Sequence, residues 1–276
     1  MPETLEQAPT RFVEASGVRF AYRRLGPDTG IPLVLLQHFT GTMDAWDPAV
    51  VNALALDRPV IAFDNTGVGA SSGETPDSVE RQAADAEAFI AALGLRQVDL
   101  LGFSLGGFLA QVMVARSALD VRRIILVGTA PRGGEEHLLR VVEEAFGRGA
   151  RDVRLPLFFT SSAASQAAGV AFVDRASARQ IDRDPDRGEA VSTPQAQAII
   201  RWCAQKEPGH ASLKAIRQPA LIVHGSDDTM FPSINAYQMF KNMNNATLII
   251  YPDSGHGALF QEPGRFVAHV NTFLDA

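Results

Sequence analysis

The 276-residue sequence contains a single cysteine, Cys203, so no disulfide can form within the chain. One thiol is typical of proteins of a reducing compartment, and the first ten residues lack the basic and apolar regions of a signal peptide. We therefore expect a cytoplasmic location. No apolar run approaches the roughly 18 residues that span a bilayer, so we expect no membrane partner.

Basic residues are also too few to form a cationic surface. The chain has 25 lysines and arginines against 31 aspartates and glutamates, and its formal net charge is −6. Nucleic-acid-binding domains carry a basic patch, so we expect no nucleic-acid partner. The metal-binding spacings H-x-H and H-E-x-x-H and paired cysteines are absent, so we expect no metal or other cofactor.

What the sequence does contain is enough apolar material for a large core. Hydrophobic residues make up 46% of the chain and charged residues 20%, which is typical of one α/β-sized domain, with room for a subdomain. Short apolar runs predict strands at residues 33–36, 59–63, 98–101, 121–127, 220–223 and 247–251. Helical patterns between them favour a mostly parallel sheet with helices on both faces.

An N-terminal β-hairpin is predicted over residues 10–25, around Ser16-Gly17. Its apolar face is expected to carry Phe12, Val18, Phe20 and Tyr22.

The segment that organises the chain is residues 97–114, QVDLLGFSLGGFLAQVMV. An apolar run stops at Gly102, Ser104 follows, and Gly106 opens a helical pattern, which predicts a strand, a tight turn and a helix. Such a turn holds the serine at a strained backbone angle with its hydroxyl beyond the strand end. In this context the G-x-S-x-G spacing favours a nucleophile over a structural turn serine.

A long helical segment interrupts the alternation of strands and helices. Residues 132–215 contain no predicted strand and leave and re-enter the sheet at the edge where the strands end. We expect a core domain formed by residues 1–131 and 216–276 and a helical lid over Ser104, although the segment is also compatible with a larger crossover. Phe159 and Trp202 are expected either to line the substrate pocket or to pack within the lid.

Two further polar residues follow predicted strands at the same edge. A serine hydroxyl needs a histidine to take its proton and a carboxylate to orient and stabilise that histidine. Asp228 follows the strand at 220–223, and His256 follows the strand at 247–251. Together with Ser104 they form a predicted catalytic triad in the chain order serine, acid, histidine.

Other residues compete for these roles. The alternative bases are His38, His224 and His269. Asp227 and Asp253 are alternative acids, for which capping a helix or a loop is the favoured interpretation.

From residue 12 to residue 274 the chain resembles the α/β-hydrolase fold superfamily. It is similar to the single-chain esterases and the cofactor-free haloperoxidases or perhydrolases. The matching segments are GFSLGG, SGHG and HGSDDTMFP, whose family pattern H-G-x-x-D-x-x-x-P places the acid at Asp228. The resemblance implies an oxyanion hole formed by the backbone N–H groups of Phe39 and Leu105. Relatives commonly have His-Gly where this chain has Gln37-His38, and we assign His38 to the substrate pocket.

The resemblance implies a serine hydrolase that cleaves a carboxylic ester or lactone of small-molecule size through an acyl-enzyme. A serine nucleophile argues against branches of the superfamily that attack with a carboxylate. Perhydrolase or haloperoxidase chemistry and carbon–carbon bond hydrolysis remain alternatives, because they use the same triad. A small-molecule receptor on the same fold, with slow turnover, is an alternative of another class.

Overall fold

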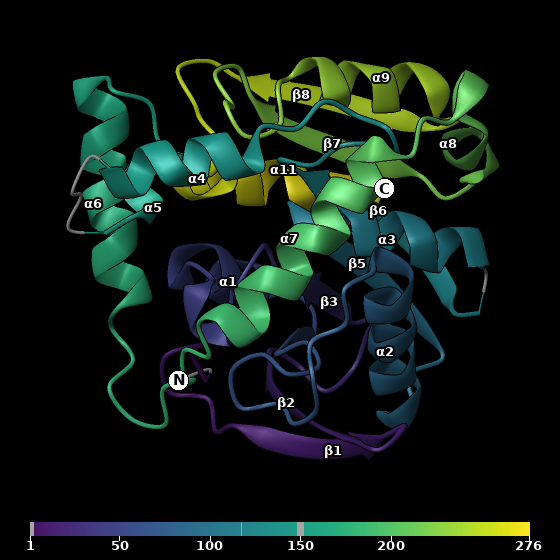
Figure 1. Ribbon diagram of the computed structural model, residues 1–276. Coiled ribbons are helices and arrows are strands. Elements are labelled where there is room, and N and C mark those ends of the chain that lie inside the picture. Colours follow the sequence, from purple (N-terminus) through teal and green to yellow (C-terminus); the bar gives the residue numbers. More distant parts are fainter. Residues whose placement is uncertain (1–2, 117, 148–151) are drawn as a thin grey trace.

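The computed structural model describes residues 3–116, 118–147 and 152–276, and in these residues eight strands form one sheet (Figure 1). The strand order is β1-β2-β4-β3-β5-β6-β7-β8. β2 runs antiparallel to β1 and β4, and the other neighbours are parallel. The strands are β1 (Arg11–Ala15), β2 (Val18–Leu25), β3 (Leu33–Leu36), β4 (Val60–Phe63), β5 (Gln97–Phe103), β6 (Asp120–Val127), β7 (Ala220–Gly225) and β8 (Ala246–Tyr251).

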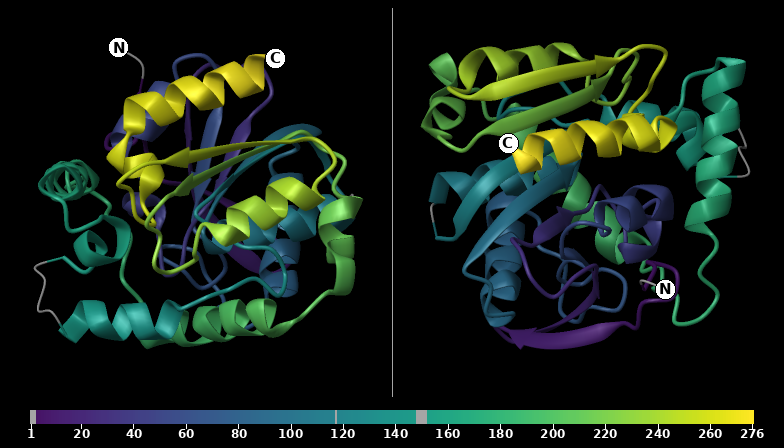
Figure 2. Two further views of the ribbon diagram at one scale, coloured as in Figure 1. Left: turned by 90° about the horizontal axis from the view of Figure 1, so that it is seen from above. Right: turned by 180° about the vertical axis from the view of Figure 1, so that it is seen from behind.

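Helices cover both faces of this sheet, as Figure 2 shows from two sides. One apolar core joins the sheet to α1 and α11, and the other joins it to α2, α3, α8 and α9. The helices are α1 (Pro48–Leu54), α2 (Val79–Ala92), α3 (Leu105–Arg116), α4 (Leu138–Gly147), α5 (Arg154–Phe158), α6 (Ala163–Ala176), α7 (Glu189–Ala204), α8 (Ala211–Ala215), α9 (Ile234–Asn242), α10 (Ala258–Gln261) and α11 (Pro263–Asp275), with 3-10 turns η1 (Met43–Ala45) and η2 (Pro208–His210). The predicted α/β architecture with a mostly parallel central sheet is confirmed.

The central strands are buried on both faces. All residues of β3 (LVLL) and β4 (VIAF) are buried, because helices cover the sheet on either side. This explains why these segments read as continuous apolar runs, whereas the edge strand β1 alternates between exposed and half-buried residues.

The N-terminal hairpin differs from expectation at one residue. Val13 lies opposite Phe20 in the register of β1 and β2, so Phe12, the neighbour of Val13, points to the other face. Phe12 is 42% exposed, and the guanidinium of Arg19 lies 3.6 Å from the centre of its ring. The prediction for Phe12 was wrong because the two-residue turn at 16–17 sets the pairing, and a shift of one residue exchanges the faces.

The segment between β6 and β7 carries α4 to α8, and its described residues contain no strand. Residues 148–151 of the predicted lid, and residues 1–2 and 117 of the predicted core, lie outside the described residues. Seen from above, α4 and α7 lie in a row along one side of the molecule (Figure 2, left). No helix of the described chain is both long and apolar enough to cross a membrane.

Candidate active site

Ser104 occupies a sharp turn between β5 and α3. Its φ of 55° lies in the left-handed region, which side chains other than glycine seldom adopt. A Cβ atom on Gly106 would lie 2.0 Å from the carbonyl oxygen of Leu36, and one on Gly102 would lie 2.4 Å from the carbonyl oxygen of Gly106. The hydroxyl of Thr129 donates to the Ser104 carbonyl at 2.8 Å. The strand-turn-helix geometry predicted for this serine is therefore present, and both glycines are sterically required.

Asp228 follows β7 and is surrounded by hydrogen-bond donors. Its Oδ1 accepts the backbone N–H groups of Met230 and Phe231, both at 2.9 Å. Its Oδ2 lies 2.8 Å from Nδ1 of His256 and 3.2 Å from Nε2 of His224. Burial acts to raise the pKa of Asp228, but the charge of His256 and hydrogen bonds from both histidines outweigh it and hold this pKa well below its usual range. The carboxylate is thus ionised and fixed in position.

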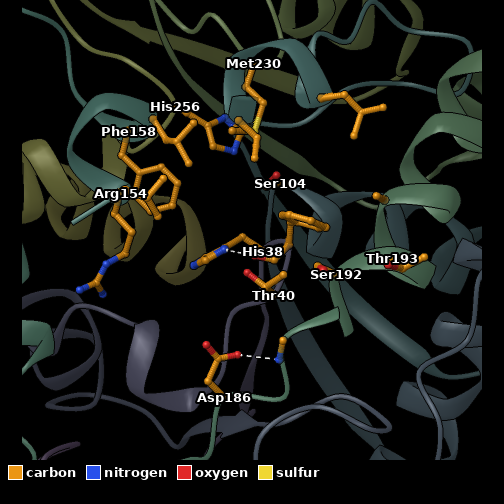
Figure 3. A pocket seen from close by; sticks show the side chains of 17 residues that line it. His38, Thr40, Ser104, Arg154, Phe158, Asp186, Ser192, Thr193, Met230 and His256 are labelled. Carbon is orange, nitrogen blue, oxygen red and sulfur yellow. Dashed lines mark hydrogen bonds between the residues drawn. The ribbon is translucent and has the colours of Figure 1, made fainter. Parts of the chain in front are cut away.

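His256 connects this carboxylate to the cavity of Ser104. It follows β8, and both His256 and Ser104 line the same cavity (Figure 3). Because Nδ1 is engaged by Asp228, the other ring nitrogen, Nε2, is left for chemistry in the cavity. The structure therefore brings the three predicted triad residues to one site.

The competing histidines make other contacts, although His224 also lies beside Asp228. His224 is fully buried, and its Nε2 donates to the carbonyl of Phe231 at 2.7 Å. His269 lies in α11 and contacts the hydroxyl of Tyr251 at 2.9 Å. Neither residue lines the cavity of Ser104.

The competing aspartates are engaged elsewhere as well. Asp227 is exposed and accepts the hydroxyl of the neighbouring Ser226. Asp253 accepts the hydroxyls of Thr160 and Ser162, each at 2.6 Å, and so ties the loop after β8 to the start of α6.

His38 does line the cavity, as expected. Its Nδ1 lies 2.8 Å from the Phe39 carbonyl, which can only accept, so Nδ1 carries the hydrogen and Nε2 is a lone-pair acceptor. Nε2 is buried and has no hydrogen-bond partner among the described residues. Burial lowers the pKa of His38 to about 3, so the ring is neutral. It packs edge-on against Phe103 and Phe158, with ring centres 5.2 and 5.3 Å away.

The cavity has a volume of about 530 Å³, within the range of small-molecule sites. The core contributes His38, Phe39, Thr40, Ser104, Met230 and His256. The segment between β6 and β7 contributes Leu139, Val142, Val153, Arg154, Leu157, Phe158, Asp186, Gly188, Ser192, Thr193 and Ala196. Most of the wall around Ser104 therefore comes from this inserted segment.

Phe159 and Trp202, which were expected either to line the pocket or to pack within the lid, lie outside this cavity. Trp202 stacks on Phe108 of α3, with ring centres 5.2 Å apart, and Phe159 packs against Phe172. Both are buried in the core, because the face of α7 that carries Trp202 turns toward the sheet and Phe159, just after α5, turns toward α6. Their assignment to the substrate pocket is corrected accordingly.

Sequence reasoning missed the residues on the faces of α4 and α7 that line the cavity. Leu139 and Val142 on α4, and Ser192 and Ala196 on α7, are spaced three or four residues apart and point to the cavity together. The spacing itself was a signal, but it did not reveal which face meets the cavity.

The chain belongs to the alpha/beta hydrolase fold family, whose model matches residues 31–263. An alpha/beta hydrolase fold protein from Chitinophaga pinensis is 41% identical, with a TM-score of 0.92 over 99% of this chain and 100% of that one. A non-heme haloperoxidase of Rhodococcus erythropolis is 29% identical, and the match covers 96% of this chain and 99% of the relative. A 2-hydroxymuconate semialdehyde hydrolase of Pseudomonas sp. (strain CF600) is 25% identical over 96% of this chain and 93% of its own.

Proposed function

We propose that this protein is a serine hydrolase that cleaves a carboxylic ester or a lactone of small-molecule size. The observation that carries the proposal is the 2.8 Å hydrogen bond between His256 and Asp228 beside the cavity that Ser104 lines. Its support is the left-handed backbone at Ser104, which is the geometry of an exposed nucleophile at a strand end. Family membership and the hydrolase-named relatives support hydrolysis as the class of reaction.

The proposed reaction proceeds in two acyl-transfer steps. Ser104 Oγ attacks the carbonyl carbon while His256 Nε2 takes the hydroxyl proton, and the charge of Asp228 stabilises the resulting imidazolium. The tetrahedral intermediate expels the alkoxide, which receives that proton from His256, and an acyl-enzyme remains. Water then attacks the acyl carbon, gives its proton to His256, and the acid leaves as Ser104 Oγ regains the proton.

Two backbone amides are proposed to stabilise the oxyanion. The amide of Leu105 is the first of α3, and the first amides of a helix have no acceptor within the helix. The amide of Phe39 has no acceptor among the described residues. Phe39 lines the cavity and Leu105 directly follows Ser104 in the chain. Unpartnered, fixed N–H groups are what a developing oxyanion requires.

We further propose that residues 132–215 act as the lid over this site. The supporting observation is that α4, α5, α7 and the chain before α7 line the cavity together with Ser104. Apolar side chains of the lid, among them Leu139, Val142 and Leu157, would contact the acyl or alcohol group of the substrate.

The relatives favour two further candidate reactions. One similar protein is named a non-heme haloperoxidase, and another is named a 2-hydroxymuconate semialdehyde hydrolase. The same triad would support perhydrolysis if hydrogen peroxide replaced water as the attacker of the acyl-enzyme. It would support carbon–carbon bond hydrolysis if the pocket accepted a ketone in place of an ester.

The test is a panel of short and medium acyl esters, lactones, thioesters and a vinylogous diketone, assayed with and without hydrogen peroxide. Wild type should turn over at least one ester or lactone, and Ser104→Ala should lose that turnover by several orders of magnitude. Ser161→Ala, at an exposed serine that does not line the cavity, should retain it. Retention of more than a few per cent of the activity by Ser104→Ala would disprove the assignment. A receptor would instead bind ligand with a rise in Tm and little turnover.

A further inference from the structure

The loop after β3 is held by hydrogen bonds on both sides of Phe39. The N–H of His38 donates to Oε1 of Gln37 at 2.9 Å. The N–H of Thr40 donates at 2.6 Å to Oε1 of Gln195, a fully buried residue on α7 that lies 155 positions further along the chain. Two glutamine carboxamides, one from the core and one from the inserted segment, therefore flank the amide of Phe39.

The carbonyl groups of the same peptides are held as well. The His38 carbonyl accepts the N–H of Gly41 at 3.0 Å, and the Phe39 carbonyl accepts Nδ1–H of His38 at 2.8 Å. Every peptide around Phe39 is thus tied down, while its own N–H has no acceptor among the described residues. A rigid backbone with one free donor beside the cavity is the arrangement of a preorganised oxyanion donor.

The backbone at Thr40 shows why a distant side chain is needed there. Its φ is 57°, a left-handed conformation that is unfavourable for a β-branched residue and persists only where surrounding contacts impose it. The contact that engages this N–H is Gln195 Oε1. Gln195 Nε2 is buried and has no partner in the described chain, and an unpaired buried donor is unfavourable for stability. The hydrogen bond of this side chain is therefore made by its oxygen, to Thr40.

We propose that Gln195 is a positioning residue for catalysis, which orients the amide of Phe39 toward the oxyanion through its hydrogen bond to Thr40. The inserted segment then takes part in stabilising the transition state in addition to shaping the pocket. This inference rests on the proposed hydrolase function and adds a residue that the family motifs do not contain.

The test compares Gln195→Met, which keeps the length of the side chain but removes the acceptor, with Gln197→Met at an exposed position of the same helix. On an ester that wild type hydrolyses, Gln195→Met should lower kcat about 10- to 100-fold with KM nearly unchanged. The reason is that a misdirected N–H donor stabilises the transition state less, while binding of the substrate is unaffected. A trifluoromethyl ketone, which forms an oxyanion with Ser104, should bind more weakly by the same factor. The product acid should bind as before, and Gln197→Met should match wild type in all assays.

Three results would overturn the proposal. Unchanged kcat and unchanged affinity for the ketone would show that the hydrogen bond does not position the amide. Equal losses of ketone and product binding, in parallel with a lowered Tm, would show a purely structural role. Absence of any Ser104-dependent turnover in wild type would disprove the hydrolase function itself and the proposal with it. If Gln195→Met does not fold, Gln195→Asn, which is polar but one methylene too short, takes its place with the same expected outcomes.

Discussion

Replacing Asp228 with asparagine should disable the site by reversing one hydrogen bond. Oδ1 accepts two backbone N–H groups, from Met230 and Phe231, so the carbonyl oxygen of an asparagine must face them. Its NH₂ group then takes the place of Oδ2 and faces both His256 Nδ1 and His224 Nε2. His224 keeps the Phe231 carbonyl as its acceptor, whereas His256 Nδ1 has to become an acceptor and move its hydrogen to Nε2. In that tautomer the imidazole cannot take a proton from Ser104.

The size of the loss follows from this geometry. The backbone hydrogen bonds remain and the side chain keeps its volume, so the fold should persist, while the base is held in the wrong tautomer. Loss of the acid in such a triad costs about four orders of magnitude in rate, which corresponds to about 5 kcal/mol of transition-state stabilisation. The measurement is kcat/KM toward the best ester of the panel, with Tm as the check on folding.

The neighbouring residue offers a matched control. Asp227 is exposed, and its carboxylate accepts a hydrogen bond from the hydroxyl of the adjacent Ser226. Asp227→Asn should therefore change kcat/KM less than about twofold, because surface substitutions usually have small effects. A loss below tenfold for a folded Asp228→Asn, or a larger loss for Asp227→Asn, would refute the assignment of the acid.

Three other predictions follow from buried groups and from the cavity wall. Burial lowers the pKa of His38 to about 3, so this ring is neutral throughout pH 5 to 8. His38→Phe should therefore leave the shape of the pH profile of kcat/KM in that range unchanged, and a changed profile would make His38 the base. Burial raises the pKa of Asp184 to about 6 against the opposing charge of Arg23, so the folded state binds the proton more tightly than the unfolded state. The contribution of Asp184 to the free energy of unfolding, measured with urea, should therefore fall by about 1 to 3 kcal/mol as pH rises from 4 to 7. Asp184→Asn should remove this contribution to the pH dependence, and an unchanged pH dependence in the variant would contradict the prediction. Val142→Ala should change the ratio of kcat/KM between acyl chain lengths by an amount equivalent to about 1 to 3 kcal/mol of discrimination. Trp202→Ala, on the core face of the lid, should instead lower Tm and leave that ratio unchanged. The reverse pattern would contradict the placement of both residues.

Sequence alone determined the features that depend on local backbone geometry. The turn at Ser104 was predictable because five consecutive residues carry its signal, a serine between two glycines that stands between an apolar run and a helical pattern. The clash that requires Gly102 is with Gly106 in the same turn, whereas the clash that requires Gly106 is with Leu36 on β3. The mostly parallel sheet was predictable because strands buried on both faces are continuous apolar runs separated by helices. Asp228 and His256 both follow parallel strands of this sheet, so their positions in the sequence are enough to place them at the same edge.

Only the tertiary structure decided which side chains meet one another across the chain. Gln195 reaches Thr40, 155 residues away, and no sequence pattern marks it among the other glutamines. On α7, Ser192 and Ala196 face the cavity while Trp202 faces the core. The physical reason is that spacing defines the faces of a helix, whereas the face that meets the site is set by how the helix docks on the rest of the molecule.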